Sequence, residues 1–266
     1  MKTWLIATLA LAAAGAQAQG TDPLKAAVAA DHRSVGNVAR DVYRHPYETL
    51  AFFGIKPTDT VVELAPGPGG WYTEILAPYL SAQGQLYEAA DDPASSSAYN
   101  QRSAARFKAK MDSMGVYGKV KITVFDPVAG KLDIAPAGSA DAVLTFRNVH
   151  NWMDAGTAQA VFNAAFKALK SGGTLGVEEH RLPASRTQDP KAGTGYVQEA
   201  TVIKFAEAAG FKLAGRSDIN ANPKDTADHP DGVWTLPPTY ALKDKDRAKY
   251  QAIGESDRMT LKFTKP

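Results

Sequence analysis

Residues 60–71 of this chain read Thr60-Val61-Val62-Glu63-Leu64-Ala65-Pro66-Gly67-Pro68-Gly69-Gly70-Trp71. The first five form a short β-branched run bounded by Pro57 and Pro66, which predicts a strand. A glycine-rich turn follows, and an amphipathic pattern that predicts a helix begins at Trp71. Glycines allow a backbone to approach a ligand closely, and a helix N-terminus presents unpaired N–H donors. The stretch therefore predicts a ligand-binding loop between a strand and a helix.

The spacing of this loop distinguishes between kinds of ligand. A dinucleotide site takes Gly-x-Gly-x-x-Gly, with the pyrophosphate resting on the helix N-terminus. Here the spacing is Ala65-x-Gly67-x-Gly69, and Glu63 lies two positions before it, where we expect it to face the ligand. A carboxylate at that point would repel a pyrophosphate and attract a cationic amine. A nicotinamide-dependent dehydrogenase is therefore disfavoured.

Outward from the loop, strand and helix patterns alternate along the chain. Strands are predicted at residues 60–64, 85–89, 120–125, 140–146, 174–177, 211–216 and 259–263, and helices at 71–80, 94–114, 155–170 and 196–209. We expect the helix over 155–170 to end at Ser171-Gly172-Gly173. The alternation predicts an α/β fold with a doubly wound, mostly parallel, seven-stranded sheet and an N-terminal helical segment. Ligands of such sheets lie beyond the carboxyl ends of the strands.

Composition excludes several classes of protein. The chain has 266 residues, of which 44% are hydrophobic and 22% charged, and it contains no cysteine. This length favours one domain, and the absence of thiolates excludes disulfide scaffolds and cysteine-ligated metal sites. A net charge of +2 disfavours nucleic acid as a partner. Asp225, Asp228, His229 and Asp231 lie close together, but their spacing matches no ligand template, so we expect no metal.

The N-terminus has the pattern of a secretory signal peptide. Lys2 precedes an apolar run over residues 4–14, and Ala16 and Ala18 suit a signal peptidase. We expect cleavage after Ala18 and a periplasmic or secreted protein. Because the apolar run is too short to cross a bilayer, we expect no membrane span in the mature chain.

The expected organisation is a signal peptide at residues 1–18, a helical segment or lid at 19–54 and a domain at 55–266. Within the helical segment, Pro46 opens a helix that Gly54 ends. Residues 40–46 mix charged and aromatic side chains ahead of the first strand. They either cover a substrate or form a solvated helix face, and the sequence leaves both open.

The loop pattern from Glu63 to Gly69 resembles motif I of the class I S-adenosylmethionine-dependent methyltransferases. In that motif an acid and a Gly-x-Gly-x-Gly loop hold the amino acid end of the cofactor. Ala65 stands at the first glycine of the motif. The resemblance extends over about residues 45–266 and implies S-adenosyl-L-methionine as cofactor, with Glu63, Ala65, Gly67 and Gly69 binding it.

The second and third predicted strands also end near acids. Residues 84–91 are similar to the family's second strand, whose terminal acid binds both ribose hydroxyls. Counting places that acid at Ala90, between Glu88 and Asp91, and we take Asp91. Asp126 follows the third strand, where the family contacts the adenine amino group and a carboxylate suits an N–H donor. An ordinary Asp-Pro strand end explains Asp126 equally well.

Later segments extend the resemblance. Residues 166–178, FKALKSGGTLGVE, are similar to the family's Lys-x-Gly-Gly turn and fifth strand, and residues 206–213, AEAAGFKL, to its last helix. His180-Arg181, residues 222–225 and residues 254–259 look like those of a bacterial group of exported predicted methyltransferases. That resemblance does not supply a substrate.

Methyl transfer needs an aligned nucleophile and, where the nucleophile carries a proton, a base. Residues 146–152 follow the fourth strand and are similar to a segment of quinone-biosynthesis methyltransferases, which implies a cofactor contact for Arg147. His150 and His180 are the candidate bases, and Asn148 the candidate for orienting substrate or cofactor. A hydrogen-bonded structural role for either histidine stays open.

Together these patterns predict an exported S-adenosylmethionine-dependent methyltransferase that acts on a small molecule. The alternative is a non-catalytic exported binding protein that retains the fold, because this cofactor is made in the cytosol and a fold does not establish activity. The methyl acceptor, the choice between the two histidines and the oligomeric state stay open.

Overall fold

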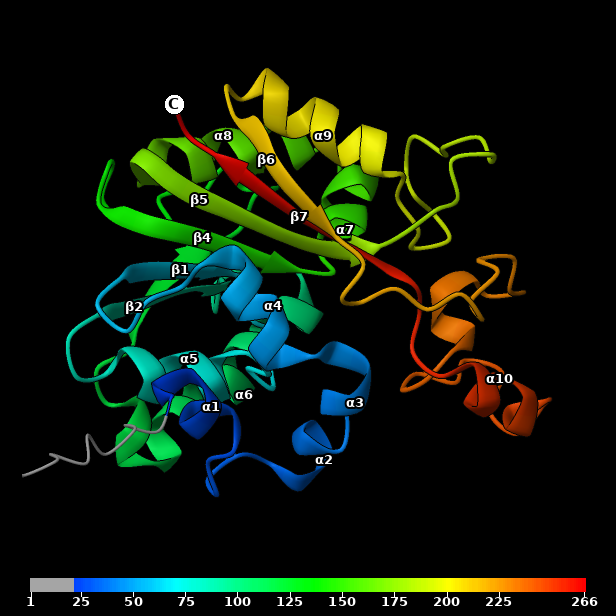
Figure 1. Cartoon of the computed structure of the whole chain (residues 1–266), viewed down its shortest axis with the longest axis horizontal. Coiled ribbons are helices and arrows are strands. Elements are labelled where there is room, and N and C mark those ends of the chain that lie inside the picture. Colours follow the sequence, from blue (N-terminus) through cyan, green and yellow to red (C-terminus); the bar gives the residue numbers. More distant parts are fainter. Residues whose placement is uncertain (1–21) are drawn as a thin grey trace, which may run out of the picture.

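A seven-stranded sheet runs through the centre of the molecule (Figure 1). The structure is a computed structural model, and it describes residues 22–266. The predicted signal peptide and its cleavage site lie outside the described residues. The strands are β1 (Thr60–Leu64), β2 (Gln85–Asp91), β3 (Lys121–Phe125), β4 (Ala140–Phe146), β5 (Leu169–His180), β6 (Lys212–Ser217) and β7 (Arg258–Thr264). They lie in the order β3-β2-β1-β4-β5-β7-β6.

The strand pairing is mostly parallel. β1 pairs in parallel with β2 and β4, β2 with β3, and β4 with β5, whereas β7 is antiparallel to β5 and β6. The predicted doubly wound fold is therefore confirmed. The strand order reverses between β1 and β4, where a crevice forms outside the carboxyl ends. Because β7 runs in the opposite direction, its first residue, Arg258, lies at the same edge, paired with His180.

Helices cover both faces of the sheet (Figure 1). One layer contains α1 (Pro23–Val28), α4 (Pro46–Phe53), α5 (Thr73–Leu80) and α6 (Ala98–Ser113), and the other contains α7 (Val149–Asp154), α8 (Ala158–Ala168) and α9 (Glu199–Ala208). Successive side chains of β1 enter opposite layers, since Val61 packs with α5 whereas Val62 and Leu64 pack with α7 and α8. In the described part of the chain, no helix is long and apolar enough to cross a membrane.

The described part of the N-terminal segment is helical, with α2 (Val35–Val38) and α3 (Asp41–Arg44) between α1 and α4. Asp22 caps α1, because its Oδ1 accepts a hydrogen bond from the backbone N of Leu24 at 2.9 Å. α4 begins at Pro46, and Gly54 ends it with a left-handed φ of 80°. The helix predicted between Pro46 and Gly54 is therefore confirmed.

One predicted helix boundary is wrong. The helix predicted over residues 155–170 ends at Ala168, before the Ser171-Gly172-Gly173 turn, and β5 begins there instead. The C-terminal segment accounts for the difference, because the backbone N of Gly172 donates to the carbonyl of Lys265 at 2.8 Å. Pairing with a segment distant in sequence extends the strand through residues that end helices in isolation.

Residues 218–257 connect β6 to β7 and lie beyond the carboxyl edge of the sheet (Figure 1). They contain η2 (Gly232–Thr235) and α10 (Arg247–Ile253), which the sequence did not predict. Asp225 braces this connection: its carboxylate is buried, accepts from the Tyr196 hydroxyl at 3.1 Å and lies 2.8 Å from Nε2 of His229. The acidic cluster in this segment is therefore part of its internal hydrogen bonding.

Candidate functional site

A cavity of about 410 Å³ opens beyond the carboxyl ends of β1, β2 and β3. It is lined by Ala65, Gly67, Asp91, Tyr99, Asn100, Phe125, Asp126, Pro127, Val128, Asn148, Asn151, Trp152, Ala155 and Thr157. Two of these residues are aspartates, and none of the described residues in the lining is lysine or arginine. We call this space the acidic cavity, and its charge favours a cation.

The loop after β1 forms one wall of the acidic cavity. Ala65 has a left-handed φ of 50° and Gly67 one of 68°. A residue with a Cβ atom pays about 1–2 kcal/mol for this conformation, so Ala65 is strained where glycine would not be. Nδ2 of Asn148 donates to the carbonyl of Leu64 at 3.1 Å and helps to hold the loop. A Cβ atom at Gly67 would meet no atom within 4 Å, so the backbone is open to a ligand there.

Asp91 and Asp126 place two carboxyl groups on this cavity. Burial raises the pKa of Asp91, a hydrogen bond with Ser103 opposes that rise, and the charge of Asp126 adds to it. The rings of Phe125 and Trp152, with centroids 6.0 Å apart, supply apolar surface. Apolar faces with carboxylates at their edge suit a nucleoside, whose hydroxyl and amino groups are hydrogen-bond donors.

We expected Glu63 to face the ligand, but it does not line the acidic cavity. Its carboxyl group is buried, accepts from the Thr73 hydroxyl at 3.1 Å and pairs across the sheet with Glu88. Because side chains alternate along β1, Glu63 enters the α5 layer with Val61. Burial raises the pKa of Glu63 to about 7 and holds that of Glu88 well above its usual range, so the two carboxyl groups retain a proton between them near neutral pH.

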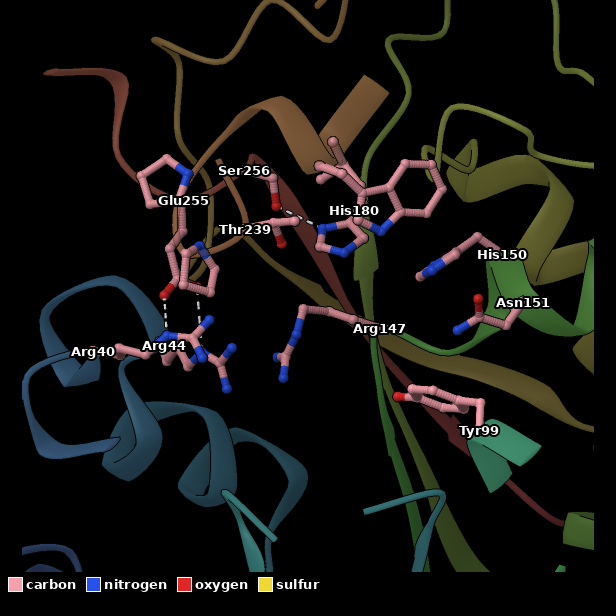
Figure 2. A pocket seen from close by; sticks show the side chains of 14 residues that line it. Arg40, Arg44, Tyr99, Arg147, His150, Asn151, His180, Thr239, Glu255 and Ser256 are labelled. Atoms are coloured by element: carbon pink, nitrogen blue, oxygen red, sulfur yellow. Dashed lines mark hydrogen bonds and ion pairs between the residues drawn. The ribbon is translucent and has the colours of Figure 1, made fainter. Parts of the chain in front are cut away.

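A second cavity, of about 400 Å³, adjoins the first (Figure 2). It is lined by Arg40, Arg44, Tyr99, Arg147, His150, Asn151, His180, Val233, Trp234, Pro237, Pro238, Thr239, Glu255 and Ser256. Tyr99 and Asn151 line both cavities, so the two spaces meet at these side chains. The lining contains three arginines and one glutamate. We call this space the basic cavity.

Glu255 binds three guanidinium groups at one end of the basic cavity. Its Oε1 lies 2.6 Å from Nε of Arg40, and its Oε2 lies 3.2 Å from Nε of Arg44 and 3.0 Å from Nη1 of Arg258. Burial would raise the pKa of Glu255, but Arg44, Arg258 and Arg40 together lower it to about 2. Glu255 is therefore ionised at physiological pH, and one carboxylate serves three cations.

Arg147 projects into the basic cavity between Arg44 and His150 (Figure 2). It has a left-handed φ of 62°, and its backbone N donates to the carbonyl of Glu178 at 2.7 Å. Its Nη1 lies 2.9 Å from Oε1 of Glu178, which is fully buried. The structure thus places Arg147 in the basic cavity rather than in the acidic cavity, where the resemblance implied a cofactor contact.

His150 and Glu179 form a buried pair at the opposite end of the basic cavity. Nδ1 of His150 lies 3.0 Å from Oε1 of Glu179, and the backbone N of His150 donates to Oε2 at 3.2 Å. With its proton on Nδ1, the imidazole donates to the carboxylate and leaves the Nε2 lone pair available as a base. Glu179 thereby fixes the orientation of the ring.

His180 lies beside this pair, with its ring centroid 5.4 Å from that of His150. Its Nδ1 is 2.6 Å from the hydroxyl of Ser256. Burial lowers the pKa of His180 well below its usual value, and the positive groups around it, including Arg147 and Arg258, lower it further. His180 is therefore neutral and its Nδ1 contacts Ser256, whereas the ring of His150 is held by a carboxylate.

The structure separates the predicted site residues into three groups. Ala65, Gly67, Asp91, Asp126 and Asn148 line the acidic cavity; Arg147, His150 and His180 line the basic cavity; Glu63 and Gly69 line neither. Glu179 was not predicted from the sequence, although an acid beside a candidate base at a strand end is a recognisable signal. Glu255 was not predicted either, because its ion pairs with Arg40 and Arg44 join residues 215 and 211 positions apart.

His150, Glu179 and His180 also offer three ligand atoms within 4.8 Å of one another. Two observations count against a cation there. The oxygens of Glu179 already accept hydrogen bonds from His150 and from the backbone N of His180 at 2.8 Å. Arg147 and Arg258 also make the surroundings positive, as their effect on the pKa of His180 shows.

Comparison with known proteins gives matches in structure only. No protein-family model and no curated protein matches this sequence. A S-adenosylmethionine-dependent methyltransferase from Aquifex aeolicus has 14% identity and a TM-score of 0.56, over 92% of this chain and 99% of its own. The [4+2]-cyclase SpnF has 15% identity and a TM-score of 0.60, over 92% of both chains. The O-methyltransferase NcsB1, solved with S-adenosyl-L-homocysteine and 1,4-dihydroxy-2-naphthoic acid, has 17% identity and a TM-score of 0.51, over 87% of this chain and 56% of its own.

These similarities are at the level of fold, since every identity is below 20%. In this chain an antiparallel β7 lies between β5 and β6. The chain therefore has the Rossmann-like fold shared by S-adenosylmethionine-dependent methyltransferases.

Proposed function

We propose that this protein transfers a methyl group from S-adenosyl-L-methionine to a small molecule bound in the basic cavity. The observation that carries the proposal is the pair of adjoining cavities with opposite charge, which meet at Tyr99 and Asn151. A cationic cofactor suits the acidic cavity, and the acceptor then occupies the basic cavity beside His150. Both spaces lie at the carboxyl edge of the sheet, where ligands of this fold class bind.

The residues of the acidic cavity fit the proposed cofactor. Asp91 would accept hydrogen bonds from the ribose hydroxyls, and Asp126 one from the adenine amino group. Phe125 and Trp152 would cover the apolar faces of the base. The open backbone at Gly67 admits the amino acid end of the cofactor. When bound, the cofactor supplies an electrophilic methyl carbon on a sulfonium, which leaves as a neutral thioether.

His150 is the base in this proposal. With the cofactor bound, the acceptor atom would take the methyl group from the sulfonium, and Nε2 of His150 would accept the proton that the acceptor loses. Glu179 holds the ring by its Nδ1 and balances the charge that it gains. His180 stays neutral and positions the acceptor through its ring.

A second candidate is a binding protein that keeps the fold without methyl transfer. SpnF, whose fold is similar at a TM-score of 0.60, is a [4+2]-cyclase, so this fold is compatible with other reactions. We also propose export to the periplasm or the medium, supported by the apolar run and the Ala16-x-Ala18 pattern of the first residues. Export would separate the protein from the cytosol, where the cofactor is made.

Calorimetry with S-adenosylmethionine and S-adenosylhomocysteine tests the cofactor assignment. We expect both to bind, and Asp91→Asn and Asp126→Asn each to weaken binding, whereas the exposed Asp112→Asn leaves it unchanged. No binding at millimolar ligand would overturn the proposal. Turnover is followed as transfer of a labelled methyl group to a small-molecule extract, and cofactor binding without any transfer would favour the binding protein.

A further inference from the structure

We infer that the basic cavity takes a small organic anion, whose carboxylate or other oxyanion is held by Arg40, Arg44 and Arg147. That this anion is the methyl acceptor rests on the proposed function; the anion site itself does not. Neither the fold nor the similar structures indicate the chemical class of the substrate, and this anion site would define it.

The basic cavity carries an excess of positive charge. The arginines in and directly behind the cavity wall are Arg40, Arg44, Arg147 and Arg258, and the carboxylates that contact them are Glu178 and Glu255. Even when Glu179 is counted with them, the arginines outnumber the carboxylates. Uncompensated cations in a largely buried space are unfavourable, and a bound anion would offset this cost.

Arg44 shows this cost most directly. Its side chain is 5% exposed, and only its Nε bonds to Glu255, at 3.2 Å. Burial lowers the pKa of Arg44 well below its usual value, and repulsion from Arg147 lowers it further. The nearby Glu255 does not restore it, because Arg40 and Arg258 bind the same carboxylate.

Several guanidinium N–H donors in the basic cavity have no protein acceptor among the described residues. Among the described residues, neither Nη atom of Arg40 or Arg44 donates a hydrogen bond to the protein, and Nη2 of Arg147 donates none. Guanidinium groups present donors in a fork that matches an oxyanion. Figure 2 shows Arg147 opposite Arg40 and Arg44, which both bind Glu255, so the three guanidinium groups face a common space.

The remaining walls fit the organic part of such a ligand. Val233, Trp234, Pro237 and Pro238 line the cavity from the segment before β7, and the ring of Trp234 lies 6.0 Å from that of His150. These apolar groups would contact the body of the molecule, while the arginines hold its charge. A volume of about 400 Å³ suits a small molecule. The acceptor atom would then lie near His150, with the anionic group toward Arg44.

The experiment compares matched acids and amides on the full chain. Binding of benzoate, phenylacetate and succinate is measured by calorimetry against benzamide, phenylacetamide and succinamide, with inorganic phosphate as a further probe. We expect at least one acid to bind roughly tenfold or more tightly than its amide, because a charge-assisted bond is lost. Arg147→Gln and Arg40→Gln should abolish this preference, and the exposed Arg216→Gln should keep it.

Three results would overturn the proposed anion site. Equal binding of acids and amides, no binding of any acid, or a preference that survives both Arg147→Gln and Arg40→Gln would overturn it, and binding of phosphate alone would show a site for inorganic anions instead. Thermal unfolding of each variant checks that it folds. Cofactor binding is measured in parallel: if it is absent while an acid binds, the proposed function fails and the anion site stands.

Discussion

Nδ1 of His150 lies 3.0 Å from Oε1 of Glu179, although 29 residues separate the two in the chain. His150 is the second residue of α7, the helix after β4, and Glu179 is the penultimate residue of β5, so the parallel pairing of these strands brings them together. The Glu179 side chain is fully buried, and that of His150 is 8% exposed. Glu179 therefore holds Nδ1 of the imidazole, and Nε2 is left for a ligand in the basic cavity.

Replacing Glu179 tests this relationship. In Glu179→Gln the ring loses the negative charge that stabilises its protonated form, so we expect the rate of methyl transfer to fall by roughly 100-fold or more. Cofactor affinity should not change, because Glu179 lines neither cavity. Transfer of labelled methyl and calorimetry measure the two quantities. An unchanged rate would remove Glu179 and His150 from the mechanism.

Glu63 and Glu88 predict an unusual dependence of stability on pH. Both carboxyl groups are raised in pKa by burial, that of Glu63 from its usual 4.5 to about 7. Such groups keep their protons when the chain folds. Their contribution to the free energy of unfolding is therefore complete below the pKa of the unfolded chain and is lost as the pH rises through the pKa of the folded protein. We expect these residues to lower the free energy of unfolding by roughly 1–3 kcal/mol between about pH 4.5 and 7.

Glu88→Gln is the variant that tests this pair. Glutamine is close to glutamate in size but does not ionise, so the variant should be more stable than the native chain at pH 8 and similar to it at pH 5. Urea unfolding across this range measures the difference. Asp112→Asn, on an exposed surface, serves as the control. If the stability of Glu88→Gln depended on pH as steeply as that of the native chain, the raised pKa values of this pair would be contradicted.

The strain at Ala65 predicts the effect of a glycine. Ala65→Gly relieves about 1–2 kcal/mol of left-handed strain and loses about 0.4–1 kcal/mol through the freer unfolded chain, so we expect a small net gain in stability. The matched control is Ala77→Gly in the interior of α5, which should lose about 1 kcal/mol. Thermal and urea unfolding compare the two. Equal losses in both variants would show that Ala65 is not strained.

The positive surroundings of His150, Glu179 and His180 predict that no divalent metal is required. Dialysis against a chelator should leave the melting temperature and cofactor binding of the full protein unchanged. Elemental analysis before and after dialysis detects any bound metal. Stoichiometric zinc that is lost in Glu179→Gln would assign these three residues to a metal site.

Much of the sheet is predictable because its signals are local. β1 and β4 occupy the predicted residues 60–64 and 140–146, since the first is a β-branched run and the second a near-continuous apolar run of the kind that a parallel sheet buries on both faces. Asp91 and Asp126 were predicted for the same reason, because an acid at a strand end is visible in sequence, and the parallel sheet places both on the acidic cavity. The segment over residues 218–257 was not predicted, because long-range contacts such as that between Tyr196 and Asp225 fix it.

The sequence by itself determined the α/β class, the glycine-containing loop after β1 and the edge of the sheet beyond which the two cavities open. Only the tertiary structure decided the chemistry of that edge. Alternation along β1 turned Glu63 into the α5 layer, parallel pairing set Glu179 against His150, and the start of β7 placed Glu255 beside Arg44. These outcomes depend on which strands lie side by side and which side chains share a buried volume, and the packing of segments distant in the chain decides both.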